Sequence, residues 1–279
     1  MRFISNEQIV RFENFLTEEE KAPATIEKYV RDIKAFESWL SDKEVSKGQV
    51  MEYKKYLSER YSVASVNSVI SSLNCFFTYF GWFDLKIRAI KLQRSLFAAD
   101  EKELTKSEYQ RLLMAAKTKK NERLYLLMQT ICSTGIRVSE LRHITVESVM
   151  HGKADIQCKG KCRSVFLPNN LCKILKKYIK ERKIKSGAVF ITKNGNPLDR
   201  SNIWSDMKKL CKSAGVSEKK VFPHNLRHLF ARTYYTLEKD IVRLSDILGH
   251  SSINTTRIYT MESGEIHRKQ IQRLGLLRC

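Results

Sequence analysis

Apolar residues in the first hundred positions recur at steps of three and four, which is the spacing of one buried face of an α-helix. The spacing is clearest over Ile26–Leu40 and Val66–Phe80, and both stretches are rich in aromatic residues. Residues typical of helix starts are Ser5 with Gln8, Ser46 with Gln49, and Ser62. The first hundred residues therefore predict a bundle of four helices with its own apolar core.

The periodicity is lost between about 86 and 103, where the composition becomes mixed and charged. It resumes after Thr105 and Glu108, a pair with the spacing of a capping box. A chain of 279 residues has the length of about two domains. We predict a helical domain over 1–88, a linker over 89–103 and a second domain over 104–279.

The second domain mixes helices with a small sheet. Two short β-prone runs, Ala154–Cys158 and Arg163–Leu167, flank Lys159-Gly160-Lys161 and predict a hairpin. A third short strand is predicted at Val189–Thr192. Helical patterns predict one helix over Leu124–Cys132, a second that begins at about Val138, and a third over Leu171–Ile184. Four or five further helical segments follow from Ser201 onward. The predicted fold class is mostly α with a small β-sheet.

Basic residues outnumber acidic residues, and the excess is uneven. Lys and Arg number 51 against 30 Asp and Glu, for a net charge of +21 and a pI of about 9.7. Residues 1–100 hold 15 basic and 14 acidic side chains, whereas residues 101–279 hold 36 and 16. This excess indicates a polyanionic partner, with nucleic acid ahead of an acidic membrane. A solvated basic face that serves solubility is the alternative.

The sequence carries no sign of a membrane span or of secretion. It has no stretch of about 18 apolar residues, and Met1–Val10 lacks the apolar centre of a signal peptide. Its seven cysteines are odd in number and scattered, which does not suit a disulfide framework. We therefore expect a cytoplasmic protein.

A short stretch around His224 carries the clearest chemical signal. A proline precedes it, as in the first turn of many helices, so His224 and Arg227 lie three apart on one face of a helix N-terminus. Free backbone N–H groups, an imidazole and a guanidinium together suit a phosphate. Metal binding by His224 with His228, or by Cys158 with Cys162, is the alternative. Neither pair has further ligands at a suitable spacing, so no metal is expected.

Two more pairs complete a pattern. His250 precedes Tyr259 by nine residues, and Arg137 follows a glycine with Glu140 three residues on. Along the chain the order is an arginine, a lysine on the hairpin, the H-x-x-R motif of His224 and Arg227, a histidine and a tyrosine. This order resembles that of the tyrosine recombinase (phage-integrase and Xer-like) family, and the resemblance extends across both domains. The resemblance implies the catalytic set Arg137, Lys159, His224, Arg227, His250 and Tyr259, with Glu140 supporting Arg137 and with Lys161 replacing Lys159 if the hairpin register shifts.

The resemblance implies an N-terminal four-helix SAM-like core-binding domain and a C-terminal α+β catalytic domain, which together clamp a duplex. The tyrosine would attack a phosphodiester and leave a 3′-phosphotyrosyl strand with a free 5′-hydroxyl. Arginines and histidines would stabilise the developing charge, and the lysine would protonate the leaving oxygen, without metal or cofactor. A type IB topoisomerase-like strand-relaxing enzyme and a non-catalytic DNA-binding regulator are the alternatives. A regulator has no use for a tyrosine nucleophile.

The segment after Tyr259 argues against the topoisomerase-like alternative. Met261–Leu277 is long enough for one more helix and carries apolar residues. In the family such a tail docks onto a neighbouring subunit, which implies a homotetramer on DNA; docking onto its own domain is the alternative. The chain begins almost directly with the bundle, so we expect no arm-binding domain and predict short double-stranded core sites as the substrate.

Leu198–Trp204 resembles the family segment whose helix enters the major groove. Arg200 there is a candidate for contact with a guanine edge, with Ser201 and Asn202 beside it, and phosphate contact alone is the alternative. Weaker candidates for contact with the DNA backbone in the first domain are Thr25, Lys28, Ser68 and Asn74. The chain departs from the family at Leu237–Asp240, which lacks the glycine that commonly follows the H-x-x-R-H motif.

Overall fold

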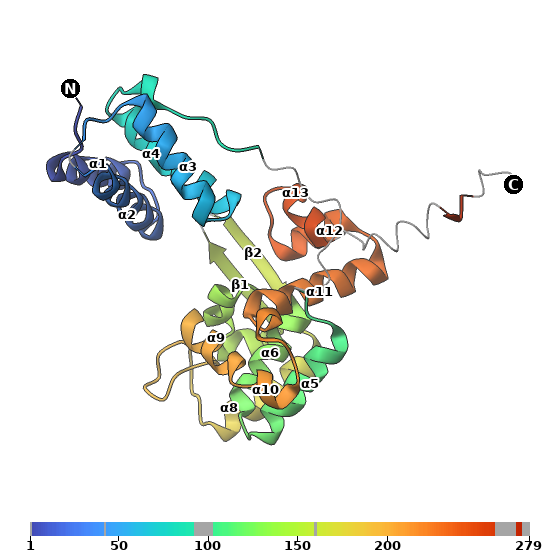
Figure 1. The fold of residues 1–279 in the computed structure, drawn as a ribbon. Helices are drawn as coiled ribbons and strands as arrows, with labels where there is room; N and C mark the ends of the chain where they lie inside the picture. The colour runs from blue at the N-terminus through green and yellow to red at the C-terminus, as the bar shows by residue number, and fades with distance from the viewer. Residues whose placement is uncertain (1, 42, 92–102, 159–160, 260–271, 275–279) are drawn as a thin grey trace, which may run out of the picture. The chain divides into compact units, whose positions relative to one another are not determined.

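The computed structural model describes residues 2–41, 43–91, 103–158, 161–259 and 272–274. The chain divides into two compact units, Met1–Arg94 and Ser95–Cys279, each with its own apolar core (Figure 1). Most of the predicted linker at 89–103 and of the predicted tail at 261–277 lies outside the described residues. In the described part of the chain, no helix combines the length and the apolar content needed to cross a membrane.

The N-terminal unit is the predicted four-helix bundle. Its helices are α1 (Asn6–Glu18), α2 (Pro23–Leu40), α3 (Lys47–Arg60) and α4 (Val63–Tyr79), followed by the short 3₁₀ helix η1 (Phe83–Leu85). Ser5, Ser46 and Ser62 each cap a helix by accepting a hydrogen bond from a backbone N–H three residues on. Each such cap satisfies an N–H group that the helix leaves free, and contributes about 1 kcal/mol.

Aromatic rings fill the core of this bundle. Phe12, Phe36, Phe76 and Phe77 have no exposed surface. Phe12 meets Phe76 edge to face, with 5.2 Å between the ring centroids. Burying each of these side chains contributes roughly 1.5–3 kcal/mol. The predicted apolar stripes are therefore the core of the unit.

The C-terminal unit is mostly helical and contains one antiparallel hairpin. Its α-helices are α5 (Lys106–Thr118), α6 (Glu122–Thr134), α7 (Val146–His151), α8 (Asn169–Glu181), α9 (Arg200–Lys208), α10 (Cys211–Ala214), α11 (Pro223–Glu238), α12 (Ile241–Leu248) and α13 (Ile253–Thr256). Its 3₁₀ helices are η3 (Val138–His143), η4 (Glu218–Lys220) and η5 (Arg257–Tyr259). Strands β1 (Lys153–Cys158) and β2 (Lys161–Phe166) form the hairpin. The predicted fold class is confirmed.

The hairpin turn is shorter than predicted. The strand register pairs Cys158 with Lys161, so Lys161 is the first residue of β2 rather than part of the turn. The helix predicted from Val138 is also tighter than expected, because η3 is a 3₁₀ helix.

The third predicted strand, at Val189–Thr192, is wrong. The chain there makes isolated bridges instead of a ladder. One joins Ala188 to Thr145, and the other joins Ile191 to Pro197. Gly187 and the turn before Pro197 bend the backbone on both sides, so one residue pairs at each point and no ladder forms. A short run of β-prone residues alone therefore does not make a strand here.

α6 crosses the middle of the C-terminal unit and packs against α5, α8 and α11 (Figure 1). It ends at Gly135, which adopts the left-handed conformation that glycine tolerates best. A Cβ at this position would lie 2.5 Å from the ring of Phe230 on α11. The missing side chain therefore lets the end of α6 approach α11 closely.

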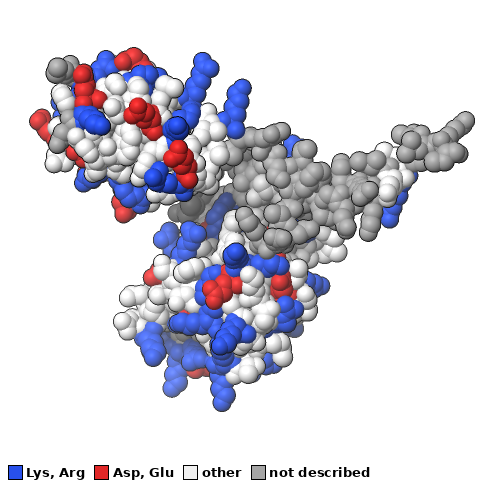
Figure 2. All heavy atoms as spheres, in the orientation of Figure 1, with Lys and Arg blue, Asp and Glu red and all other residues white. Residues whose placement is uncertain are grey.

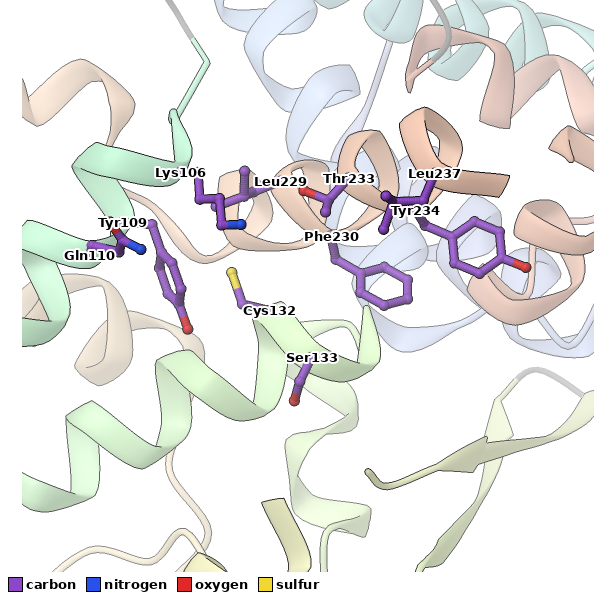
Figure 3. Close-up of a pocket in the computed structure, with 10 residues that line it drawn as sticks. All are labelled: Lys106, Tyr109, Gln110, Cys132, Ser133, Leu229, Phe230, Thr233, Tyr234 and Leu237. Atoms are coloured by element: carbon purple, nitrogen blue, oxygen red, sulfur yellow. The ribbon is translucent and has the colours of Figure 1, made fainter. Parts of the chain in front are cut away.

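A small second cluster of apolar residues joins α11, α12 and η5. Its buried members are Ala231, Leu244, Leu248 and Tyr259. Beside it, between α5, α6 and α11, lies a cavity of about 320 Å³ whose lining includes Tyr109, Cys132 and Leu237 (Figure 3). Among the predicted catalytic residues that the structure describes, none lines this cavity, so it is separate from the cluster of basic side chains described next.

Candidate active site

Arg227 lies in the second turn of α11 and is almost fully buried, with 2% of its surface exposed. Its Nη1 donates to the Gly135 carbonyl at 2.5 Å, and its Nη2 donates to the Leu248 carbonyl at 2.7 Å and to Nε2 of His250 at 2.9 Å. Burial, followed by the charge of Arg137, lowers the pKa of Arg227 to about 10. The guanidinium is still charged at neutral pH.

Arg137 precedes η3, and Glu140 holds it in place. Its Nη1 donates to Oε1 of Glu140 at 2.8 Å, its backbone N–H donates to Oε2 at 2.9 Å, and its Nη2 donates to the Gly249 carbonyl at 3.1 Å. Burial would raise the pKa of Glu140, but hydrogen bonds from Arg137 and the charges of Arg163 and Arg137 outweigh this effect and lower it. Glu140 is thus a buried counterion, while 37% of the Arg137 side chain stays exposed.

The structure adds Arg163, which the sequence analysis missed. Arg163 lies on β2 and faces the same side of the hairpin as buried Val165, two residues on. Its Nη2 donates to Oε2 of Glu140 at 2.6 Å, and its Nη1 donates to the Ile247 carbonyl at 2.5 Å. The available signal was its position on the inward face of an alternating strand, where an arginine needs buried partners.

Three consecutive carbonyl groups at the end of α12 each bind a different arginine. The pairs are Ile247 with Arg163, Leu248 with Arg227, and Gly249 with Arg137. Carbonyls at a helix C-terminus lack partners within the helix and lie at the negative end of its dipole. Together with the carboxylate of Glu140, they offset the repulsion among three neighbouring guanidinium groups. The arginines come from β2, α11 and the connection after α6, so this turn gathers distant parts of the chain.

His250 follows this turn and is held in one tautomer. An arginine side chain can only donate, so the contact from Arg227 makes Nε2 of His250 an acceptor. The ring proton therefore lies on Nδ1, which donates to Oγ1 of Thr256 at 2.9 Å. Burial, followed by the charge of Arg227 and other arginines, lowers the pKa of His250 to about 4. The ring is neutral at pH 7.

His224 and His228 lie on α11 and contact each other edge to face, with 4.5 Å between ring centroids. Desolvation, then the charges of Arg227, Arg200 and Arg137, lowers the pKa of His224. Burial, then His224, lowers the pKa of His228 to about 4. Within the described residues, Nδ1 of His228 is buried without a hydrogen-bond partner. Over those same residues, no group of three or more His, Cys, Asp or Glu side chains could hold a metal ion.

Tyr259 is buried among these groups, with 4% of its surface exposed. Its ring meets that of His228 edge to face at 4.7 Å and lies nearly parallel to that of His250 at 6.0 Å. Its hydroxyl interacts with the guanidinium of Arg227, which raises the pKa of Arg227 against the larger effect of burial. The short segment from α13 to η5 thus folds the tyrosine back against the histidine nine residues before it.

Most of the predicted catalytic residues meet in this one cluster. Arg137, Arg227, His250 and Tyr259 are linked through hydrogen bonds or ring contacts, directly or through Gly249. His224 borders the cluster through His228, whose role the sequence analysis did not foresee. Lys159 lies outside the described residues, and Lys161 is placed only by its strand register.

The predicted DNA-reading residues Arg200, Ser201 and Asn202 occupy the first turn of α9 and are exposed. The backbone N–H of Asn202 donates to Asp199 at 2.7 Å, which caps the helix. The side-chain amide of Asn202 donates to the other oxygen of the same carboxylate at 3.2 Å. The charge of Arg200 is felt by His224, so the start of α9 lies near the cluster.

Two of the predicted DNA contacts in the first unit, Lys28 and Ser68, bind each other. Lys28 on α2 donates to the carboxylate of Asp32 at 2.5 Å, to the carbonyl of Ser68 at 3.1 Å and to the hydroxyl of Ser72 at 3.0 Å. Ser72 also donates to Asp32 at 2.7 Å. This network joins α2 to α4 and uses the three donors of the Lys28 ammonium. Thr25, at the start of α2, is partly exposed.

The fourth candidate, Asn74, holds the segment that follows the bundle. Its amide nitrogen donates to the Ile87 carbonyl at 2.8 Å, and its oxygen accepts from the Ile87 N–H at 3.0 Å. Asn67, about two helical turns earlier on α4, binds Ile90 in the same two-way manner. Asn74 would have to release Ile87 to contact DNA with its full amide group.

A helical bundle and an α+β unit in which arginines and histidines surround a buried tyrosine define the tyrosine recombinase class. Residues 102–265 match the Phage integrase family, and residues 9–82 match the phage integrase N-terminal SAM-like domain. The tyrosine recombinase XerA of Thermococcus kodakarensis is 31% identical over 283 residues, which cover 98% of this chain and 96% of XerA. This chain belongs to the phage integrase family.

Solved structures agree with this assignment. A crystal structure of XerA recombinase is 27% identical with a TM-score of 0.53, covering 98% of this chain and 99% of the other. A λ integrase tetramer bound to a Holliday junction has the same fold, with a TM-score of 0.71, 20% identity and coverage of 91% and 76%. The protein is a site-specific tyrosine recombinase, a DNA strand-exchange enzyme. The matches favour neither the topoisomerase-like alternative nor the non-catalytic regulator.

Proposed function

We propose that Tyr259 cleaves DNA within the cluster formed by its own chain. The phenolic oxygen attacks a phosphodiester, the bond between phosphorus and the 5′ oxygen breaks, and a 3′-phosphotyrosyl strand and a free 5′-hydroxyl result. The phenolic proton leaves to a neutral histidine of the cluster, and Lys159, or alternatively Lys161, protonates the leaving oxygen. The main support is the contact of Tyr259 with His228, His250 and Arg227 in a single chain.

The basic groups supply the electrostatics of this reaction. Negative charge grows on the nonbridging oxygens of the phosphate as the tyrosine attacks, and fixed donors stabilise it without rearranging. Arg137 offers an exposed side for this contact, while Arg227 is buried beside the nucleophile. His224 adds a further donor, and His250, whose Nε2 accepts from Arg227, holds that arginine in place. No metal ion and no cofactor take part in the proposed reaction.

A nicked suicide substrate tests the proposal. A nick close to the cleavage site lets the short 5′-hydroxyl fragment diffuse away, so the cleaved strand stays attached to the protein. The full chain with EDTA present is expected to give a covalent adduct, and peptide mapping is expected to place it on Tyr259. An adduct on another residue, or its complete loss in EDTA, would contradict the proposed reaction.

We further propose that both units clamp double-stranded DNA core sites, with the domain limits 1–88 and 104–279 and the linker 89–103. The solved λ integrase relative is bound to DNA. On the visible face of this protein, basic side chains dominate the C-terminal unit, whereas both signs mix on the N-terminal unit (Figure 2). The proposed DNA contacts are Thr25, Lys28, Ser68, Asn74, Lys161, Arg200, Ser201 and Asn202. Acting on DNA, the protein would work in the cytoplasm.

Four copies are proposed to assemble on DNA, as in the λ integrase tetramer, with the tail 261–277 docked onto a neighbouring subunit. Removing this tail is expected to abolish the pairing of two sites while single-site cleavage on a suicide substrate continues, because Tyr259 and its partners precede the cut. Gel shifts with two labelled duplexes measure pairing, and adduct formation measures cleavage. Unchanged pairing would exclude docking between subunits.

A further inference from the structure

Arg163 is bound mainly by groups of the protein itself. Its side chain is 15% exposed, and both terminal nitrogens are occupied, one by Glu140 and one by the Ile247 carbonyl. Its aliphatic part passes directly over Gly249, where a Cβ would lie 2.4 Å from Cδ of Arg163. Gly249 also has a φ of +62°, a conformation that few other residues adopt readily. Arg163 is therefore built into the cluster rather than held out toward solvent.

Arg163 and Arg137 share the carboxylate of Glu140 unequally. Oε1 accepts from the side chain of Arg137 alone, whereas Oε2 accepts from the side chain of Arg163 and the backbone N–H of Arg137. An arginine beside a free carboxylate prefers to bind both oxygens in a bidentate fork. Because Arg163 occupies Oε2, the guanidinium of Arg137 keeps one bond to Glu140 and one to the Gly249 carbonyl.

We infer that Arg163 is a positioning residue for Arg137. By occupying Oε2 of Glu140, it prevents Arg137 from closing onto the carboxylate and keeps its exposed side turned toward the scissile phosphate. Arg163 itself touches no substrate atom. The inference rests on the proposed function, since it concerns the charge that Arg137 places beside the phosphate when the tyrosine attacks.

A purely structural role for Arg163, in attaching β2 to α12, predicts a different outcome. A loosened fold would slow the cleavage of every substrate by a similar factor. The effect of a misplaced Arg137 would grow with the negative charge that the phosphate carries for it to stabilise. A methylphosphonate, in which a neutral methyl group replaces one nonbridging oxygen, carries one negative charge fewer throughout the reaction and leaves the bonds that form and break unchanged.

The test compares full-length wild type, Arg163→Gln and Arg163→Lys on suicide substrates with a phosphodiester or a methylphosphonate at the cleaved position. Arg163→Gln is expected to form the adduct about 10- to 100-fold more slowly than wild type on the phosphodiester, the usual cost of losing a partner that orients an active-site group. On the methylphosphonate the deficit is expected to shrink to a few-fold. Arg163→Lys, which keeps a charge but cannot reach both acceptors, is expected to show the same pattern in milder form.

Arg243→Gln is the matched control, because Arg243 lies on α12 with 71% of its side chain exposed, and it is expected to cleave both substrates at the wild-type rate. Equal deficits of the Arg163 variants on both substrates, or no deficit, would overturn the inference. If Arg163→Gln does not fold, as judged by thermal melting, Arg163→Lys decides by the same comparison. A wild-type protein that forms no Tyr259 adduct on the phosphodiester would instead overturn the proposed function.

Discussion

Tyr259→Phe is expected to abolish covalent attachment to DNA and to leave duplex binding within about twofold of wild type, because only the attacking oxygen is lost. The ring itself is buried against His228 and His250. Phenylalanine preserves both contacts, so the cluster keeps its shape. Denaturing gel electrophoresis of a suicide-substrate reaction measures the adduct, and a gel shift at fixed salt measures binding.

Tyr235→Phe provides the control for this result. Tyr235 packs against the same apolar cluster from α11, so the substitution removes a hydroxyl of the same kind from the same part of the fold. We expect this variant to form the adduct at the wild-type rate. If Tyr259→Phe still formed an adduct, the nucleophile would be another residue. If Tyr259→Phe lost DNA binding as well, the tyrosine would have a structural role that its ring contacts do not explain.

The helices and their starts could be predicted from sequence because the signals are local. A serine or threonine cap acts on an N–H three residues away, as at Ser5 and Thr105. The spacing of apolar residues is likewise a property of each helix by itself, so it can be recognised without knowing how the helices pack. The strand predicted at Val189–Thr192 failed for the opposite reason, since a strand exists only when a partner pairs with it over several consecutive residues.

Most residues of the cluster could be named from sequence because their motifs resemble a family, but the contacts that hold the cluster together could not. Arg163 and Ile247 are 84 residues apart, and nothing near Arg163 indicates which carbonyl it binds. The same limit applies to Lys28 and Asn74, whose polar side chains suggested DNA contacts. Their partners, Ser72 and Ile87, become neighbours only after the bundle has folded.

The three carbonyls at the end of α12 explain why this cluster can exist before DNA arrives. Guanidinium groups brought close together repel one another and lose hydration on burial. Here each has an acceptor fixed by the backbone, and Glu140 adds a full negative charge. The site is therefore organised in advance for an anion, and a phosphate would add to an arrangement that is already stable.

Arg227→Lys is the most direct test of this organisation. A lysine keeps the positive charge but has a single ammonium, which cannot span the carbonyls of Gly135 and Leu248 as the guanidinium does. Losing a fixed donor at the reacting phosphate is expected to slow adduct formation about 100- to 1000-fold. A buried carbonyl left without a partner is expected to cost about 1–3 kcal/mol of stability, and with it a few degrees of melting temperature.

The effect of the substitution on stability can be separated from its effect on the reaction. To do so, the rate of adduct formation is measured under single-turnover conditions, well below the melting temperature of the variant. Arg232→Lys, on the same helix but paired with Glu103 at its partly exposed end, is expected to cleave at the wild-type rate. If Arg227→Lys melted early yet cleaved normally when folded, Arg227 would serve only to join α11 to α6 and α12. A slow variant with an unchanged melting temperature would mean that lysine satisfies the carbonyls, so that the fork geometry of the guanidinium matters to the phosphate alone.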